Sequence, residues 1–185
     1  MAVKHMTFQG ITGSGKTELA KRLSGIMRTS NRGVLVFDPL ASSQGMNIDG
    51  WSGLVFTDWA AFLRHFWASR GCMVFIDEAG DVFNDHKEEA RPMLTRGRHV
   101  DPKTNGGGHT VALISQRWLQ LDKTARNQVS ILFGFRSNID DAIELSRQFA
   151  CPDLRDLANF ELLHYMHVTG TTSKKGVVTF PKKKA

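Results

Sequence analysis

The segment Gly10-Ile11-Thr12-Gly13-Ser14-Gly15-Lys16-Thr17 is a complete GxxxxGKT phosphate-binding loop, the Walker A motif. Glycines in such a loop allow successive backbone N–H groups to turn inward around phosphates, while Lys16 supplies a positive charge and Thr17 a hydroxyl for Mg²⁺. An extended apolar segment, Val3–Gln9, precedes the loop, and apolar residues at helical spacing follow it. The loop therefore opens a helix whose positive dipole end faces the anion. This arrangement predicts a nucleoside triphosphate held by residues 10–17.

The composition indicates one domain over residues 1–185. A chain of 185 residues with 41% hydrophobic content can bury one substantial core, and no low-complexity linker divides it. No stretch of about 18 apolar residues and no signal-peptide pattern occurs, so we expect a soluble protein. Cys72 and Cys151 are interpreted as reduced packing residues. The net charge of +6 suggests a polyanionic partner, although part of it lies in a basic C-terminal tail that solvation alone can explain.

Short apolar runs alternate with helical patterns along most of the chain. This alternation predicts an α/β fold, with a mostly parallel central sheet flanked by helices on both faces. We assign residues 169–185 to a basic C-terminal strand and tail, with a short strand at Val177–Phe180 and the tail lysines Lys174, Lys175 and Lys182–Lys184. The other candidate strands are Val3–Gln9, Gly33–Asp38, Leu54–Thr57, Cys72–Asp77, Thr110–Ser115, Val129–Phe135 and Glu161–Val168.

A second motif, Cys72-Met-Val-Phe-Ile-Asp-Glu78, is an apolar strand that ends in adjacent carboxylates and is typical of Walker B. Asp77, at the carboxyl end of a central parallel strand, is expected to face the phosphate-binding loop and hold Mg²⁺ either through Thr17 or through a bound water. Glu78 is placed to orient and deprotonate the water that attacks the γ-phosphate. An apolar run followed by Asp-Glu is common by itself and usually marks only the end of a strand. Its position after a phosphate-binding loop makes the Walker B interpretation much more specific.

A third motif, Thr110-Val-Ala-Leu-Ile-Ser-Gln-Arg117, is a buried strand that ends in the polar residue Gln116. A neutral amide there can donate to the γ-phosphate or hold the attacking water, and we prefer this sensor role to that of a simple strand cap. An arginine from outside the pocket would accelerate hydrolysis. We select Arg96 and Arg98 in Leu94-Thr-Arg-Gly-Arg-His99, for which a solvated or DNA-facing basic patch is the alternative role. The other candidate arginines are Arg91, Arg117 and Arg136.

Taken together, GITGSGKT, CMVFIDEAG, LTRGRH and VALISQR resemble the FtsK–HerA superfamily of DNA-pumping ATPases. The likeness is greatest to the genome-packaging ATPases of tailless icosahedral viruses that contain a membrane. It covers Val3–Arg136 and implies a RecA-like P-loop ATPase of the additional-strand catalytic-glutamate type.

The resemblance also implies functional assignments. ATP and Mg²⁺ are the expected cofactors, with Lys16 and Thr17 on the phosphates and metal, Asp77 on the metal, Glu78 on the water and Gln116 as the sensor. The implied assembly is a homo-oligomeric ring, a hexamer, around double-stranded DNA, with capsid or vertex proteins as partners. Such a motor packages a viral genome into a preformed capsid and works in the host cytoplasm or at the virion vertex.

Other classes of protein remain as alternatives. The zonula-occludens-toxin-like assembly ATPases of filamentous phages share the P-loop, the carboxylate strand end and an RH-then-Q arrangement, but they normally carry a transmembrane segment. A small-molecule P-loop kinase suits the length, yet Asp77-Glu78 is better suited to activating water. A regulatory GTPase is disfavoured because no NKxD motif occurs. A DNA-binding module with a degenerate nucleotide site is disfavoured because the catalytic elements are intact.

Overall fold

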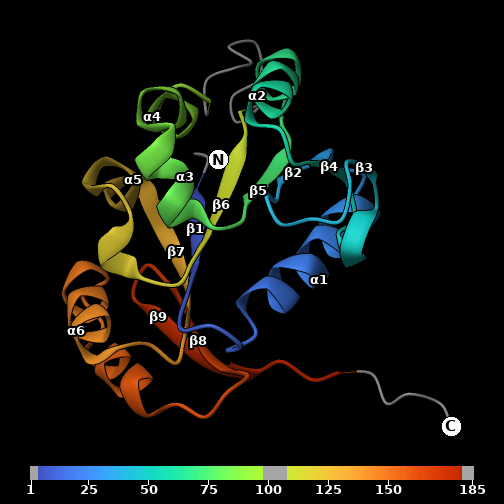
Figure 1. Ribbon diagram of the computed structural model, residues 1–185. Helices are drawn as coiled ribbons and strands as arrows, with labels where there is room; N and C mark the ends of the chain where they lie inside the picture. Colours follow the sequence, from blue (N-terminus) through green and yellow to red (C-terminus); the bar gives the residue numbers. More distant parts are fainter. Residues whose placement is uncertain (1–3, 98–107, 181–185) are drawn as a thin grey trace, which may run out of the picture.

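The computed structural model describes residues 4–97 and 108–180, which build one nine-stranded sheet with helices on both faces (Figure 1). Across the sheet the strand order is β3-β4-β2-β5-β6-β1-β7-β8-β9. The strands are β1 (His5–Gln9), β2 (Val34–Phe37), β3 (Gly45–Met46), β4 (Leu54–Phe56), β5 (Met73–Ile76), β6 (Thr110–Ser115), β7 (Val129–Phe135), β8 (His164–Thr169) and β9 (Thr172–Val177). The α-helices are α1 (Lys16–Thr29), α2 (Trp59–Ala68), α3 (Ala79–Asp85), α4 (Lys87–Thr95), α5 (Lys123–Gln128) and α6 (Ile139–Gln148).

The central strands, β4-β2-β5-β6-β1-β7, are parallel, and β3, β8 and β9 extend the sheet in antiparallel pairing. Strands β2, β5 and β6 are buried along their whole length, as expected for parallel strands covered on both faces. Because parallel strands end at the same edge of a sheet, the loops that follow β1, β5 and β6 are gathered together.

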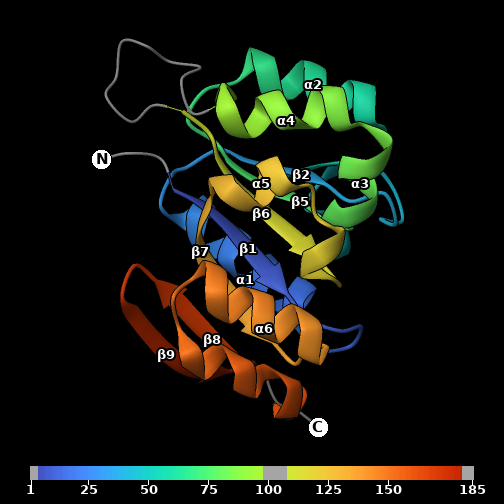
Figure 2. The ribbon, with the colours of Figure 1, turned by 90° about the vertical axis from the view of Figure 1, so that its left-hand side faces the viewer.

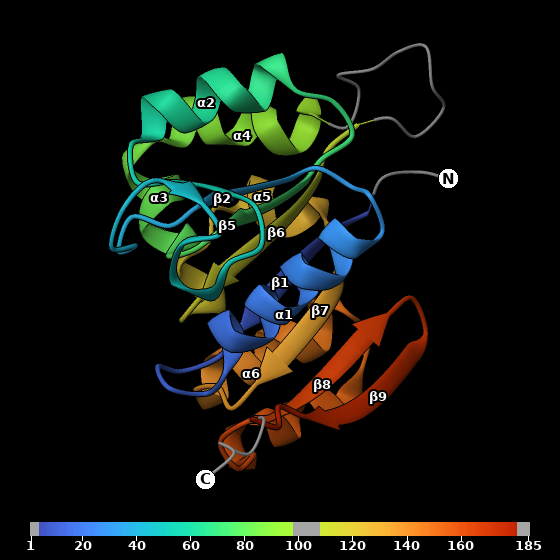
Figure 3. The ribbon, with the colours of Figure 1, turned by 90° about the vertical axis from the view of Figure 1, so that its right-hand side faces the viewer.

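The two faces of the sheet carry different helices. Helix α1 lies across one face (Figure 3), where Ala20 packs among Phe8, Val36 and Phe75. The opposite face is covered by α2 to α6 (Figure 2), and its core includes Phe62 of α2. The buried side of helix α2 is aromatic. Trp59, Phe62 and Phe66 recur at helical spacing, so all three face the core.

The predicted α/β fold is confirmed, but the C-terminal part differs from expectation. The strand predicted at Val177–Phe180 is wrong: β9 covers Thr172–Val177 instead and pairs with β8 through backbone hydrogen bonds. Lys174 and Lys175 therefore lie on an edge strand and not in a tail. The short strand β3 was not predicted, because two residues carry no periodicity. Val3, Lys182–Lys184 and residues 101–107 of the glycine-rich loop lie outside the described residues.

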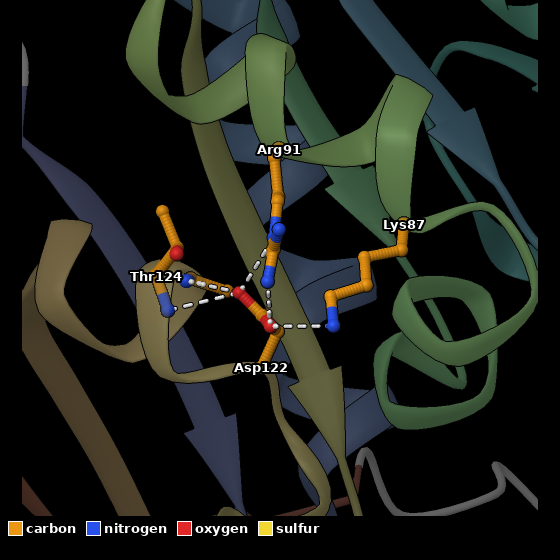
Figure 4. Close-up of polar contacts among 5 residues, drawn as sticks. Lys87, Arg91, Asp122 and Thr124 are labelled. Atoms are coloured by element: carbon orange, nitrogen blue, oxygen red, sulfur yellow. Dashed lines mark hydrogen bonds and ion pairs between the residues drawn. The ribbon is translucent and has the colours of Figure 1, made fainter.

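A cluster of charged side chains joins α4 to the start of α5 (Figure 4). Arg91 donates two hydrogen bonds to the Asp122 carboxylate, from Nε to Oδ1 at 3.1 Å and from Nη2 to Oδ2 at 2.7 Å. Asp122 also caps α5 by accepting from the backbone N–H groups of Thr124 and Ala125, and Lys87 lies 3.9 Å away. The Arg91 hydrogen bond is the main cause that lowers the pKa of Asp122 to about 2. Both helices are thereby fixed to each other.

Replacement of this carboxylate should destabilise the protein. We expect Asp122→Ala to lower the free energy of unfolding by about 2 kcal/mol, because a helix cap and a charged hydrogen-bond pair are lost together. Asp122→Asn keeps an acceptor for the cap and should lose about half as much. Since the folded-state pKa is depressed, the difference from wild type should be full above pH 4 and shrink as the pH falls toward 2. Urea denaturation curves measure it, and equal stability of Asp122→Ala and wild type would contradict the assignment.

Candidate nucleotide-binding site

The loop between β1 and α1 is shaped by its glycines. Gly13 and Gly15 have φ angles of +74° and +101°, in the left-handed region that favours glycine. Gly10 lies so near the end of β7 that a Cβ there would be 2.7 Å from Phe135 Cβ and 2.8 Å from the Arg136 carbonyl oxygen. The backbone N–H of Ile11 donates to that same carbonyl at 2.8 Å. The loop is thus clamped against β7, with the amino end of α1 behind it.

Lys16 is a buried cation at the base of this loop. Its ammonium group donates to the Ile11 carbonyl oxygen at 2.8 Å, and only 7% of the residue is exposed. Burial lowers the pKa of Lys16, whereas the charges of Asp77 and Glu78 oppose the shift. Inside the loop, this ammonium group contacts a neutral carbonyl oxygen. A bound polyphosphate would supply the full negative charge that such a buried cation favours.

Asp77 follows β5 and meets the loop from the other side. Thr17 Oγ1 donates to Asp77 Oδ2 at 3.2 Å. The carboxylate is buried, and burial is the first cause that raises the pKa of Asp77 to about 6; the charges of Asp38 and Glu78 add to this. A desolvated carboxylate beside a threonine hydroxyl has the oxygen donors that Mg²⁺ prefers.

Glu78 stands beside Asp77 in an unusual backbone conformation. Its φ and ψ angles are +48° and +41°, a left-handed geometry that is costly for a residue with a side chain, and its N–H donates to Asp77 Oδ1 at 2.9 Å. Gln116, which follows β6, donates through Nε2 to both carboxylate oxygens of Glu78 at 3.3 and 3.4 Å. Thr12 Oγ1 donates to Gln116 Oε1 at 2.8 Å. A chain of hydrogen bonds therefore links the phosphate-binding loop to Glu78 through Gln116.

These groups line a single cavity of about 110 Å³. Within the described residues, no cluster of three or more His, Cys, Asp or Glu side chains could hold a metal alone. Mg²⁺ in nucleotide sites takes few protein ligands and shares the substrate phosphates, so the Thr17 and Asp77 pair fits it. The cavity is lined by Thr12, Gly13, Lys16, Thr17, Asp77, Glu78, Ile114, Ser115 and Gln116.

The candidate arginines have different surroundings. Arg91 is bound to Asp122, and Arg117 Nε donates to the buried carboxylate of Asp141 at 2.7 Å, so both have structural partners. Arg136 is exposed at the end of β7, beside the loop. Arg96 is exposed at the end of α4, and the next residue, Gly97, accepts a backbone hydrogen bond from His109 before β6 begins. Since β6 runs from there to Gln116, Arg96 lies about 20 Å from the site. Arg98 lies outside the described residues.

Some residues at the site carry no sequence signal. Leu163 donates its backbone N–H to the Ser14 carbonyl oxygen at 3.1 Å, and Val178 packs beside Gly15. Both are apolar and lie far along the chain, in the part that no motif covers. A second cavity of about 420 Å³ adjoins Glu78 and Gln116 and is lined also by Phe37, Pro39, Leu40, Asp81, Val82, Asp85 and His86.

The fold and the site together define a P-loop ATPase of the additional-strand catalytic-glutamate type, since β6 separates the Walker A strand β1 from the Walker B strand β5. The family model for zonular occludens toxin (Zot) matches residues 6–164. The chain belongs to this family. The comparison with curated proteins finds no similar sequence.

Solved structures share the fold. The genome packaging NTPase B204 from Sulfolobus turreted icosahedral virus 2, in complex with sulfate, has a TM-score of 0.74 at 16% identity, over 97% of this chain and 98% of that chain. VirB4 of Thermoanaerobacter pseudethanolicus has a TM-score of 0.67 at 9% identity, covering 96% and 90%. The pCW3 conjugation coupling protein TcpA has a TM-score of 0.67 at 12% identity, covering 93% and 59%. The predicted resemblance to packaging and DNA-pumping ATPases is confirmed for the fold. Across residues 4–97 and 108–180, no helix combines the length and apolar character needed to cross a membrane.

The raised pKa of Asp77 predicts a cost in stability. Because its folded-state pKa of about 6 exceeds the ordinary 3.8, the nucleotide-free protein should lose stability as the pH rises from 4 to 6. We expect Asp77→Asn to raise the free energy of unfolding at pH 7.5 by about 1–3 kcal/mol and to remove the Mg²⁺-dependent part of ATP affinity. Denaturation and titration calorimetry measure these effects, with Asp156→Asn, an exposed site on the 3₁₀ helix Pro152–Asn159, as the unchanged control. A destabilised Asp77→Asn protein would contradict this account.

Proposed function

We propose that this protein is an ATP-driven DNA translocase, and in particular one subunit of a viral motor that pumps double-stranded DNA into a preformed capsid. The observation that carries the proposal is the position of Glu78. It is hydrogen-bonded to Gln116 at the rim of the cavity that also holds Lys16 and Asp77. A carboxylate held by a neutral amide beside a triphosphate site is suited to activating water, which favours hydrolysis over transfer to an organic acceptor.

Each residue then has a defined task in hydrolysis. Lys16 and the backbone N–H groups of the loop bind the phosphates, and Thr17 and Asp77 hold Mg²⁺, which neutralises phosphate charge when bound. Glu78 accepts a proton from water as the water oxygen bonds to the γ-phosphorus, and the bond from that phosphorus to the β–γ bridging oxygen breaks, releasing ADP. Gln116 holds Glu78 in place before attack and can donate to the γ-phosphate.

In a ring, a neighbouring subunit would supply the arginine that stabilises the negative charge on the γ-phosphate during hydrolysis. Arg96 cannot reach its own site across the length of β6, so it can act only on a neighbouring subunit, and we extend this assignment to Arg98. The cavity beside Glu78 offers an entry for such a cation, since Asp81 and Asp85 add negative charge to its lining. A hexamer with ATP between subunits is consistent with this arrangement.

DNA as the transported polymer rests on charge and on the relatives. The net charge of +6 favours a polyanion. A likeness to a packaging NTPase and to a conjugation coupling protein supports transport of DNA. Capsid or vertex proteins are the partners that packaging requires, at the virion vertex or in the host cytoplasm.

Membership of the Zot family favours a second candidate, an ATPase that assembles filamentous phage. Both candidates use the same hydrolytic site, so they differ in the polymer that stimulates it. The form of the DNA distinguishes them: long double-stranded DNA should stimulate a packaging motor, and circular single-stranded DNA an assembly motor.

Phosphate release from ATP, with and without long double-stranded DNA, tests the proposed function. We expect stimulation by DNA in the wild type, loss of nucleotide binding in Lys16→Ala, and retained binding with turnover reduced about 10²- to 10⁴-fold in Glu78→Gln. Asp156→Asn should behave as wild type. Normal turnover in Glu78→Gln would remove this carboxylate from the mechanism, and dependence on a small hydroxylated acceptor would make the protein a kinase.

Mixed rings test the arginine assignment. Arg96→Ala and Glu78→Gln subunits should each be inactive alone. When mixed, each Glu78→Gln subunit supplies Arg96 to the intact site of its neighbour, so activity should rise above that of either pure variant. The same experiment applies to Arg98→Ala. Undiminished turnover of pure Arg96→Ala and Arg98→Ala rings would exclude both residues.

A further inference from the structure

The order of strands sets the direction in which a nucleotide must lie. The water-activating residue Glu78 and the metal ligand Asp77 follow β5, and Gln116 follows β6, so the γ-phosphate belongs on the β5–β6 side of the loop. The loop itself follows β1. Since β7 and β8 lie on the other side of β1, the nucleoside end must leave the loop toward them.

The chain after β9 lies at this position. It runs past the amino end of α1 (Figure 1) and is linked to the phosphate-binding loop indirectly, through backbone hydrogen bonds on either side of Leu163. Leu163 donates to the Ser14 carbonyl oxygen at 3.1 Å, and Val178 donates to the Leu163 carbonyl oxygen at 2.9 Å. Leu163 has a φ of +69°, a conformation that a leucine keeps only where its surroundings enforce it. The segment Val178–Phe180 is therefore positioned by the loop.

This segment carries an exposed aromatic ring to the first turns of α1. Phe180 is 57% exposed, while Val178, two residues before it, is 2% exposed. The guanidinium carbon of Arg22 lies 5.6 Å from the centre of the Phe180 ring. Arg22 Nε donates to Glu18 Oε1 at 3.0 Å, and Glu18 directly follows the loop residue Thr17. Arg22 lies about 9 Å along the helix from Lys16, a distance comparable with the length of a nucleoside.

We propose that Phe180, Arg22 and Glu18 form the base-binding part of the nucleotide site, with a purine ring stacked on Phe180. An aromatic face accepts any purine, and Arg22, held by Glu18 over one face of the Phe180 ring, would fix that ring so that its other face can receive the base. The proposal rests on ATP binding to the loop, and it assigns a role to the part of the chain that follows the matched residues 6–164.

Comparison of two ligands tests this assignment: Mg²⁺·ATP, and inorganic tripolyphosphate, which lacks a base. We expect Phe180→Ala to weaken ATP binding about tenfold, because one base-stacking contact is lost, and to leave tripolyphosphate binding unchanged. Phe180→Trp should retain ATP affinity, and its added fluorescence should be quenched by ATP and not by tripolyphosphate. Ile26→Ala is the matched control, because Ile26 has the same 57% exposure at the far end of α1.

The outcomes separate this inference from the proposed function. Equal ATP affinity of Phe180→Ala and wild type, with both proteins folded to the same melting temperature, overturns the base site and leaves the ATPase intact. Equal weakening of ATP and tripolyphosphate also overturns it, since Phe180 would then support the loop and not the base. Failure of wild type to bind either ligand instead contradicts the phosphate site itself.

Discussion

The hydrogen bond between Thr17 and Asp77 is the contact on which the site depends. It joins the first turn of α1 to the end of β5 across the intervening strand β6, at a donor–acceptor distance of 3.2 Å. Asp77 directly follows the buried strand β5, and its carboxylate is held where burial raises its pKa to about 6. A charge kept in such an unfavourable place costs stability, and a metal–phosphate complex would remove the cost. Binding of a metal–phosphate complex should therefore stabilise the folded protein.

Around this contact the nucleotide site is extended along the edge of the sheet. Glu78 and Gln116 lie toward β5 and β6, where chemistry on the γ-phosphate is proposed, and the segment after β9 lies on the opposite side of β1. Arg96 is at the far edge, beside the start of β6. Under the proposals above, hydrolysis, base binding and contact with a neighbouring subunit fall in three separate regions of one domain. The proposed ring would use this separation, because each subunit would both hold ATP and act on the ATP of its neighbour.

The motifs of the site could be predicted because each one is local in sequence. Gly10 to Thr17 and Asp77-Glu78 each determine their own geometry, and the parallel pattern places their strand ends at one edge. The position of Gln116 beside Glu78 followed from the same rule. From the motifs we placed the packaging motors above the Zot-like proteins. The family match is to Zot, and the structural likeness includes the packaging NTPase. Both share the local motifs, so the motifs could not separate them.

What could not be predicted depends on long-range packing. Arg91 was a candidate for the arginine that acts on ATP, and its pairing with Asp122 depends on how α4 packs against α5. The hydrogen bonds that link Ser14 to Leu163 and Leu163 to Val178 correspond to no sequence motif. The most direct test of the central claim is a crystal structure with Mg²⁺ and a non-hydrolysable ATP analogue. We predict phosphates in the loop, the metal on Thr17 and Asp77, and the γ-phosphate beside Gln116 and Glu78. A γ-phosphate directed toward β7, or an analogue bound away from Lys16, would contradict the account.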